Sequence, residues 1–137
     1  MSFDWSRYFT LALDLDNQAK TATDPQIQEA RWRSAISRAY YACWCLGRNK
    51  LKIQDDLLAM CLKDHTSASQ CLRDHGCVIS YYLQSGDTSR RQIGDDLQRM
   101  MRARKQADYD DVVPNLKRLC DQQLLFAQDT LAALNTV

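Results

Sequence analysis

The sequence predicts an all-α protein, arranged as an up-and-down bundle of four long helices plus one or two short helices. Apolar residues recur every three or four positions along most of the chain, and no segment shows the alternation of a β-strand. Only four glycines and two prolines occur in 137 residues, which favours helices. This length corresponds to one domain, so we treat residues 1–137 as a single helical domain.

The first two long helices are predicted at residues 3–21 and 25–48. In the first, apolar side chains follow helical spacing from Trp5 onward. Between the two helices, Asp24 can cap a helix and Pro25 suits a first helical turn, so the second helix begins there.

The second helix is apolar on nearly all sides. One face carries Trp32, Ala35, Ile36, Ala39, Cys43 and Leu46. Tyr41, Trp44 and Cys45 lie roughly opposite. A helix of this kind must be covered on both sides, so it is either central in the bundle or meets another subunit. We favour a subunit contact for part of it and assign Tyr41, Trp44 and Cys45 to a homodimer interface.

The rest of the chain is predicted to be helical at residues 55–64, 71–84 and 89–105, with a last helix that starts at Pro114 and runs to about residue 134. Residues 106–113, QADYDDVV, are expected to be irregular.

Composition excludes several classes of protein. The net charge of +1 excludes a strongly basic nucleic-acid coat protein, although a local basic patch remains compatible with it. No run of 18 apolar residues occurs, so no membrane span is expected. The first residues do not resemble a signal peptide. We therefore expect a cytoplasmic protein whose six cysteines are reduced.

The near-repeat CLKDH (61–65) and CLRDH (71–75) places Cys and His four residues apart, a spacing that suits a metal. A shift of ten residues rotates a continuous helix by about 280°, however, so the two pairs face apart. We expect no metal and no cofactor.

A basic cluster precedes an acidic segment. The cluster consists of Arg90, Arg91, Arg99, Arg102, Arg104 and Lys105. It is either a solvated helix face or a surface that contacts phosphates. For the second alternative, the nucleic-acid-binding residues are Arg99, Arg102, Arg104 and Lys105.

Three segments together resemble the HEPN domain superfamily, and in particular its small stand-alone bacterial and archaeal members. They are RSAISRAYYACWCLG (33–47), DHGCVISYYL (74–83) and LQRMMRARKQADYDD (97–111). The similarity covers nearly the whole chain and includes an SRAYYA helix and a later R-x-x-ADYD segment. It implies a helical bundle, commonly dimeric, that binds or acts on RNA. Several such proteins are toxins paired with a nucleotidyltransferase antitoxin.

The sequence departs from the superfamily at its ribonuclease motif, R-x4-6-H, which lies just before the last helix. Arg104 occupies the arginine position, but Tyr109 stands where the shortest spacing puts histidine. A tyrosine pKa of about 10 is far from that of a good general base at neutral pH. The candidate catalytic residues are Arg104, Asp108, Tyr109 and His75, which belongs to a different helix.

Two interpretations of the acidic segment are compatible with each other. In the first, Asp108 or Asp110 accepts a bidentate hydrogen bond from Arg38 or Arg104, which fixes the segment to the bundle. The predicted structural network then contains Arg38, Tyr40, Asp108 and Asp110, with Tyr109 packed beside it. In the second, Arg102 and Arg104 hold RNA phosphates and Tyr109 stacks or donates a hydrogen bond.

We therefore expect a dimeric HEPN-like module that binds RNA, a nucleotide or a partner protein, without the usual ribonuclease pair. One alternative is a toxin-like, metal-independent endoribonuclease with a nucleotidyltransferase-type antitoxin. A third is a purely structural helical scaffold. Enzymatic activity stays open, with the missing histidine favouring a protein that is not an enzyme.

Overall fold

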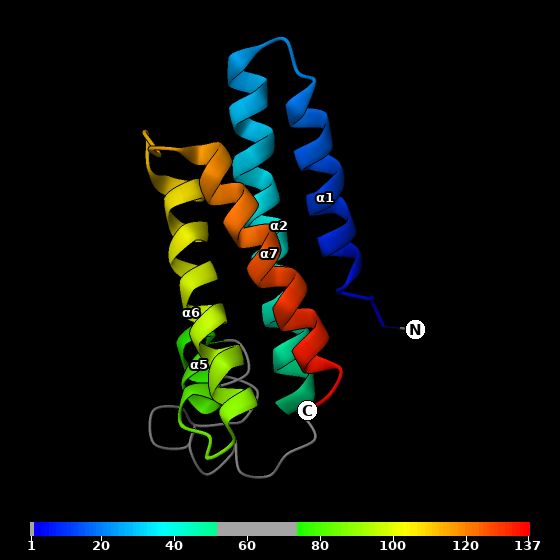
Figure 1. Cartoon of the computed structure of the whole chain (residues 1–137), viewed down its shortest axis with the longest axis vertical. Helices are drawn as coiled ribbons and strands as arrows, with labels where there is room; N and C mark the ends of the chain where they lie inside the picture. Colours follow the sequence, from blue (N-terminus) through cyan, green and yellow to red (C-terminus); the bar gives the residue numbers. More distant parts are fainter. Residues whose placement is uncertain (1, 52–73) are drawn as a thin grey trace.

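The computed structural model describes residues 2–51 and 74–137, and structural statements below concern these residues. They form five helices and no strand. The helices are α1 (Arg7–Lys20), α2 (Pro25–Leu51), α5 (His75–Leu83), α6 (Thr88–Tyr109) and α7 (Leu116–Leu134). Figure 1 shows that the four long helices alternate in direction, while the short α5 lies beside α6. The predicted all-α bundle is confirmed; the helix predicted at 55–64 lies outside the described residues.

Helix α2 is the centre of the bundle and contacts each of the other four helices. This explains why its sequence is apolar on nearly all sides. Trp44 and Cys45 are only 4% and 3% exposed within the single chain. The prediction that these two residues contact a second subunit is therefore wrong, because their own chain already covers them. Tyr41 is half-buried, and its place in a dimer interface stays a prediction.

Local capping explains where several helices begin. The side chain of Asp24 accepts hydrogen bonds from the backbone N–H groups of Gln26 and Ile27, so α2 starts at Pro25 as predicted. In the same way, Asp87 caps α6 by accepting from the N–H of Ser89.

The end of α6 differs from the prediction. The helix continues through Ala107, Asp108 and Tyr109, so only residues 110–115 connect it to α7. The chain enters α7 through Asn115, whose φ of 53° is left-handed, and the helix begins at Leu116, two residues after Pro114. The acidic segment is therefore largely a helix end.

The two helices of the α5–α6 hairpin approach closely at Gly94. A Cβ atom at this position would lie 2.7 Å from the backbone nitrogen of Leu83. Glycine is therefore required for close packing here, while Tyr82 on the same short helix donates a hydrogen bond to the carbonyl of Gly47 in α2.

The cysteines differ in state. Cys43, Cys45 and Cys120 are buried and belong to no disulfide, whereas Cys77 is disulfide-bonded. The prediction that all six cysteines are reduced is therefore wrong at Cys77, and Cys61 and Cys71 lie outside the described residues. None of the helices in the described part of the chain is both long and apolar enough to cross a membrane.

Candidate functional site

His75 is the first residue of α5 and packs against the middle of α2. Its ring stacks on Trp44 at a centroid distance of 4.1 Å and an interplanar angle of 10°. Its Nδ1 lies 2.6 Å from the hydroxyl oxygen of Tyr40. The Asp74 side chain caps α5 by accepting from the N–H of Cys77, which fixes the first turn that carries the imidazole.

Burial and neighbouring cations keep His75 neutral. Desolvation lowers its pKa below the ordinary value, and the positive charge of Arg104 lowers it further. Burial also raises the pKa of Tyr40, so its hydroxyl stays protonated. In the tautomer whose Nδ1–H donates to this hydroxyl, Nε2 of His75 carries the lone pair that a general base needs.

Arg104 of α6 faces the same part of α2. Its guanidinium carbon lies 5.5 Å from the ring centroid of Tyr40 and 5.6 Å from that of Tyr41. The side chain is 11% exposed and forms an ion pair of 3.5 Å with Asp108, one turn further along the helix. Its buried Nε has no hydrogen-bond partner among the described residues. Arg104 is therefore held over the aromatic rings with donor capacity to spare.

These contacts continue in both directions as one series of rings and arginines. On one side, the guanidinium of Arg38 lies 5.3 Å from the ring of Tyr41 and 4.7 Å from that of Tyr8. On the other, Arg48 lies 5.3 Å from the ring of Trp44 and 5.4 Å from that of Trp5. We name this series the ring–arginine row. Its members are Tyr8, Arg38, Tyr41, Arg104, Tyr40, His75, Trp44, Arg48 and Trp5.

The row has little acidic compensation. Within the described part of the chain, an ion pair is present for Arg104 but not for Arg38 or Arg48, whose other side-chain contacts are with Ser37 and Asn49. Three nearby cations lower the pKa of His75 through their positive charges: Arg104, Lys105 and Arg48. The row is thus a half-buried, cationic and aromatic strip across α1, α2, α5 and α6.

The acidic segment is fixed to the bundle by Arg33, which was not among the predicted site residues. Its guanidinium donates to the backbone carbonyls of Ala107, Asp110 and Asp111 at 2.9, 2.6 and 3.1 Å. Of the two predicted alternatives, Arg104 forms the ion pair with Asp108, whereas the guanidinium of Arg38 lies over the rings of Tyr8 and Tyr41. Asp110 takes part through its carbonyl oxygen.

Asp108 is the acid that joins the site. Its Oδ2 lies 3.5 Å from Arg104 and accepts a hydrogen bond of 3.4 Å from the hydroxyl of Ser37. The predicted Arg104–Asp108 contact is therefore present as a single ion pair. Tyr40 lies beside it, as predicted, but Tyr109 is 75% exposed, so the prediction that Tyr109 packs into the network is wrong.

The predicted nucleic-acid-binding residues do not share one face. Arg102 and Arg104 are two positions apart, which turns their side chains about 200° from each other on a helix. Arg102 and Lys105 are exposed. Arg99 is 56% exposed, pairs with Asp96 at 3.8 Å and lies over Phe126. Among these residues, Arg104 alone faces the ring–arginine row.

The sequence contains a pattern that indicates part of the ring–arginine row. Ser37, Tyr40, Tyr41, Trp44 and Arg48 recur at helical spacing on α2, which gives one stripe of rings flanked by polar groups. Their pairing with His75 and Arg104 depends on the packing of α5 and α6, which the stripe alone does not specify.

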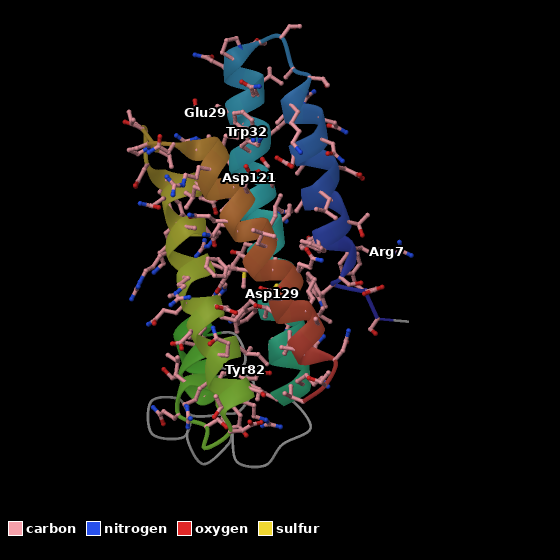
Figure 2. The ribbon with its side chains drawn as sticks, in the orientation of Figure 1. Arg7, Glu29, Trp32, Tyr82, Asp121 and Asp129 are labelled. Carbon is pink, nitrogen blue, oxygen red and sulfur yellow. The ribbon has the colours of Figure 1, made fainter. Side chains whose placement is uncertain are left out.

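A pocket of about 560 Å³ lies away from the ring–arginine row, at the end of the bundle where α2 meets the start of α7. Its residues Glu29, Trp32 and Asp121 are labelled in Figure 2. Several of its polar groups already have partners: Glu29 pairs with Arg33, Asp121 with Lys117, and the Trp32 N–H with Asp16. The ring–arginine row is the stronger candidate because it has buried donors without partners among the described residues, at Arg104 Nε and Trp44 Nε1.

No known protein family, curated protein or solved structure matches the chain. The resemblance to the HEPN superfamily therefore stays a prediction made from the sequence motifs. Likewise, no cluster of metal-ligating side chains is found among the described residues.

Proposed function

We propose that the protein binds single-stranded RNA along the ring–arginine row. The observation that carries this proposal is the alternation itself: each arginine of the row lies over an aromatic ring that is held by α1 or α2. Proteins bind single strands by combining cations for the phosphates with flat side chains for the bases. Arg38 and Arg48 are half-buried, so each can reach a phosphate while it keeps its ring contact.

The test is fluorescence anisotropy of a labelled ten-nucleotide oligouridine with the wild type and with the Arg38→Gln and Arg48→Gln variants. Each variant should bind about tenfold more weakly, because one charge-assisted phosphate contact is lost. Each should also reduce the slope of log K against log salt by about 0.7, the value for one phosphate on a single strand.

The matched control is Arg118→Gln, an exposed arginine on α7 outside the row. It should bind RNA as the wild type does. Equal weakening by all three arginine changes would indicate unspecific attraction to the surface, and an absence of RNA binding by the wild type would contradict the proposal.

A second function, metal-independent RNA cleavage, is favoured by the position of His75 beside Arg104. The neutral Nε2 of His75 would take the proton from a ribose 2′-OH, whose oxygen then attacks the adjacent phosphorus. The bond from phosphorus to the 5′ oxygen breaks, and that oxygen takes up a proton. Arg104 would stabilise the charge that develops on the phosphoryl oxygens.

Cleavage is tested with a mixed RNA pool in EDTA. The wild type should produce 2′,3′-cyclic phosphate ends, whereas His75→Asn and Arg104→Ala should not. A 2′-deoxy oligonucleotide should remain intact with every protein. Intact RNA at high wild-type concentration would leave binding as the function and eliminate cleavage.

The family resemblance adds two proposals about partners. A homodimer would place two rows in one particle, and a nucleotidyltransferase-type antitoxin would act on or cover them. Sedimentation of the purified chain tests the first, and co-expression with a neighbouring nucleotidyltransferase tests the second.

A further inference from the structure

A second, smaller pocket adjoins the ring–arginine row where α1, α2 and the end of α6 meet. Its volume is about 400 Å³, within the range of roughly 300–1,000 Å³ that is usual for small-molecule sites. It is lined by Leu11, Leu15, Ser34, Ser37, Arg38 and Asp108. The two leucines of α1 form an apolar wall, while the groups on α2 and α6 are polar.

Arg38 and Asp108 belong both to this pocket and to the surroundings of the row. The guanidinium of Arg38 also contacts the rings of Tyr8 and Tyr41, and Asp108 pairs with Arg104. A nucleotide whose phosphate lies on the row can therefore place its base in the pocket.

The acid in this pocket has acceptor capacity left. Oδ2 of Asp108 accepts one hydrogen bond, from the hydroxyl of Ser37, and its 3.5 Å contact with Arg104 is an ion pair. The side chain is 29% exposed, so its Oδ1 and one lone pair of Oδ2 can face a ligand. A carboxylate accepts two parallel N–H bonds from a donor pair of matching geometry.

Guanine is the RNA base that fits such an acceptor. Its Watson–Crick edge presents two adjacent donors, N1–H and the N2 amino group, beside the O6 acceptor. Adenine and cytosine present one amino donor next to a ring acceptor, and uracil presents one N–H between two acceptors. The hydroxyl of Ser34 and the guanidinium of Arg38 can donate to O6, and the leucine wall can cover a face of the ring.

We propose that this pocket binds a guanine base of the RNA, with Asp108 accepting from N1–H and the N2 amino group. The proposal rests on the proposed RNA binding along the ring–arginine row and adds a base preference to it. Single-stranded RNA is recognised in general by hydrogen bonds to exposed Watson–Crick edges.

The experiment compares three labelled pentamers, UUGUU, UUIUU and UUAUU, in anisotropy titrations with the whole chain. Inosine (I) lacks only the N2 amino group, so it isolates one donor of the pair. UUGUU should bind about tenfold more tightly than UUIUU, because a hydrogen bond to a charged acceptor is lost. UUAUU should bind no better than UUIUU.

Three variants locate the preference. Asp108→Asn should reduce the ratio of guanine to inosine affinity to below about threefold, because the charged acceptor is lost. Ser34→Leu, on the exposed side of α2, should fill the pocket and also abolish the preference. The control Asp111→Asn changes an exposed acid whose role in the structure is its backbone carbonyl, and it should keep the tenfold ratio.

The outcomes separate this proposal from the proposed function. Equal affinity for the three pentamers, with RNA still bound, would overturn the guanine pocket and leave RNA binding intact. A tenfold preference that survives both Asp108→Asn and Ser34→Leu would place the guanine elsewhere and also overturn the pocket. If none of the pentamers and no oligouridine binds, RNA binding fails and the pocket fails with it.

Discussion

The imidazole of His75 is placed where a positive charge is costly. It stacks on Trp44 and Tyr40, is half-buried and faces the guanidinium of Arg104. Desolvation and the neighbouring cation act in the same direction, and Asp74 opposes them only in part. The folded protein therefore binds a proton at this position less readily than the unfolded chain does.

The pH dependence of stability follows from this difference. Because the folded-state pKa of His75 is lowered, the unfolded chain binds more protons once the pH falls below about 6.5, the unfolded value. The contribution of His75 to stability is therefore present above that pH and is lost as the pH falls towards the folded pKa. Urea unfolding at pH 7.5 and pH 5.0 measures the loss.

The comparison variant is His75→Phe, which keeps a stacked ring but does not titrate. The wild type should lose more stability than the variant over this interval. Parallel losses in the two proteins would show that other groups account for the acid sensitivity and that the charge on His75 does not.

Arg33 gives a second prediction for a single residue. Its guanidinium supplies hydrogen bonds to three carbonyls at the end of α6, and its side chain is 19% exposed. Arg33→Leu should destabilise the fold by about 2 kcal/mol, since these acceptors lose a charged donor. Arg31→Leu, which removes one exposed bond to a carbonyl, should change stability by less than about 0.5 kcal/mol. Similar unfolding midpoints for the two variants would contradict this role.

Among the elements, the α5–α6 hairpin determines whether the site exists. Helix α5 is short, at 9 residues, and it brings His75 to Tyr40 of α2, while α6 brings Arg104 to the same tyrosine. A helix this short is not stable alone, so its position depends on its packing. The close approach at Gly94 is where that packing has least room.

Replacing this glycine should displace α5. A Cβ atom at Gly94 would lie 2.7 Å from the backbone nitrogen and 2.9 Å from Cγ of Leu83. Overpacking costs about 1–3 kcal/mol, and the better helix propensity of alanine returns about 1 kcal/mol, so Gly94→Ala should destabilise the fold by up to about 2 kcal/mol. Gly86→Ala is the control, because nothing lies within 4 Å of its new methyl group. The free energies of unfolding of both variants are measured by chemical denaturation. A Gly94→Ala variant more stable than Gly86→Ala would contradict the prediction.

At the scale of the whole molecule, the bundle has one continuous core around α2. Three cysteines that belong to no disulfide lie in this core: Cys43 and Cys120 are fully buried, and Cys45 is 3% exposed. Burial raises the pKa of Cys43 and raises that of Cys120 to about 12, so neither forms a reactive thiolate at neutral pH.

These thiols should react with iodoacetamide only when the bundle opens as a whole. Mass spectrometry of labelled peptides across a urea series should show the three sites becoming reactive together, at the unfolding midpoint seen by circular dichroism. Labelling of Cys120 well before Cys43 would instead indicate that α7 detaches separately from α2.

The sequence predicted most of the fold because helical periodicity and capping are local properties. Asp24 and Pro25 placed the start of α2 correctly, for example. The extension of α6 to Tyr109 was missed because it depends on Arg33, which contacts Ala107 from 74 positions away. Helix propensity reflects only neighbouring residues, so it does not predict a hydrogen-bond donor that comes from another helix.

The site could be predicted only in part for the same reason. Arg104, Asp108, Tyr40 and His75 were among the candidates, and the contact between Arg104 and Asp108 was predicted, but the contacts of His75 with Tyr40 and Trp44 were not. Trp44 was assigned to a dimer contact because it lies on the second apolar face of α2, which another element or subunit had to cover. The stacked imidazole that covers it comes from α5, and a helical wheel of one element does not show that contact.

The hydrogen bonds from Arg33 to the end of α6 affect how the sequence can change during evolution. Arg33 binds main-chain oxygens, which every residue type supplies, so the letters at positions 110 and 111 are under little constraint from this contact. Relatives of this protein could lose the acidic letters and still keep the same helix end. A sequence profile that gives weight to Arg33, and to its separations of 74, 77 and 78 residues from the three carbonyl groups it contacts, would find such relatives. A profile built on the ADYD motif would miss them.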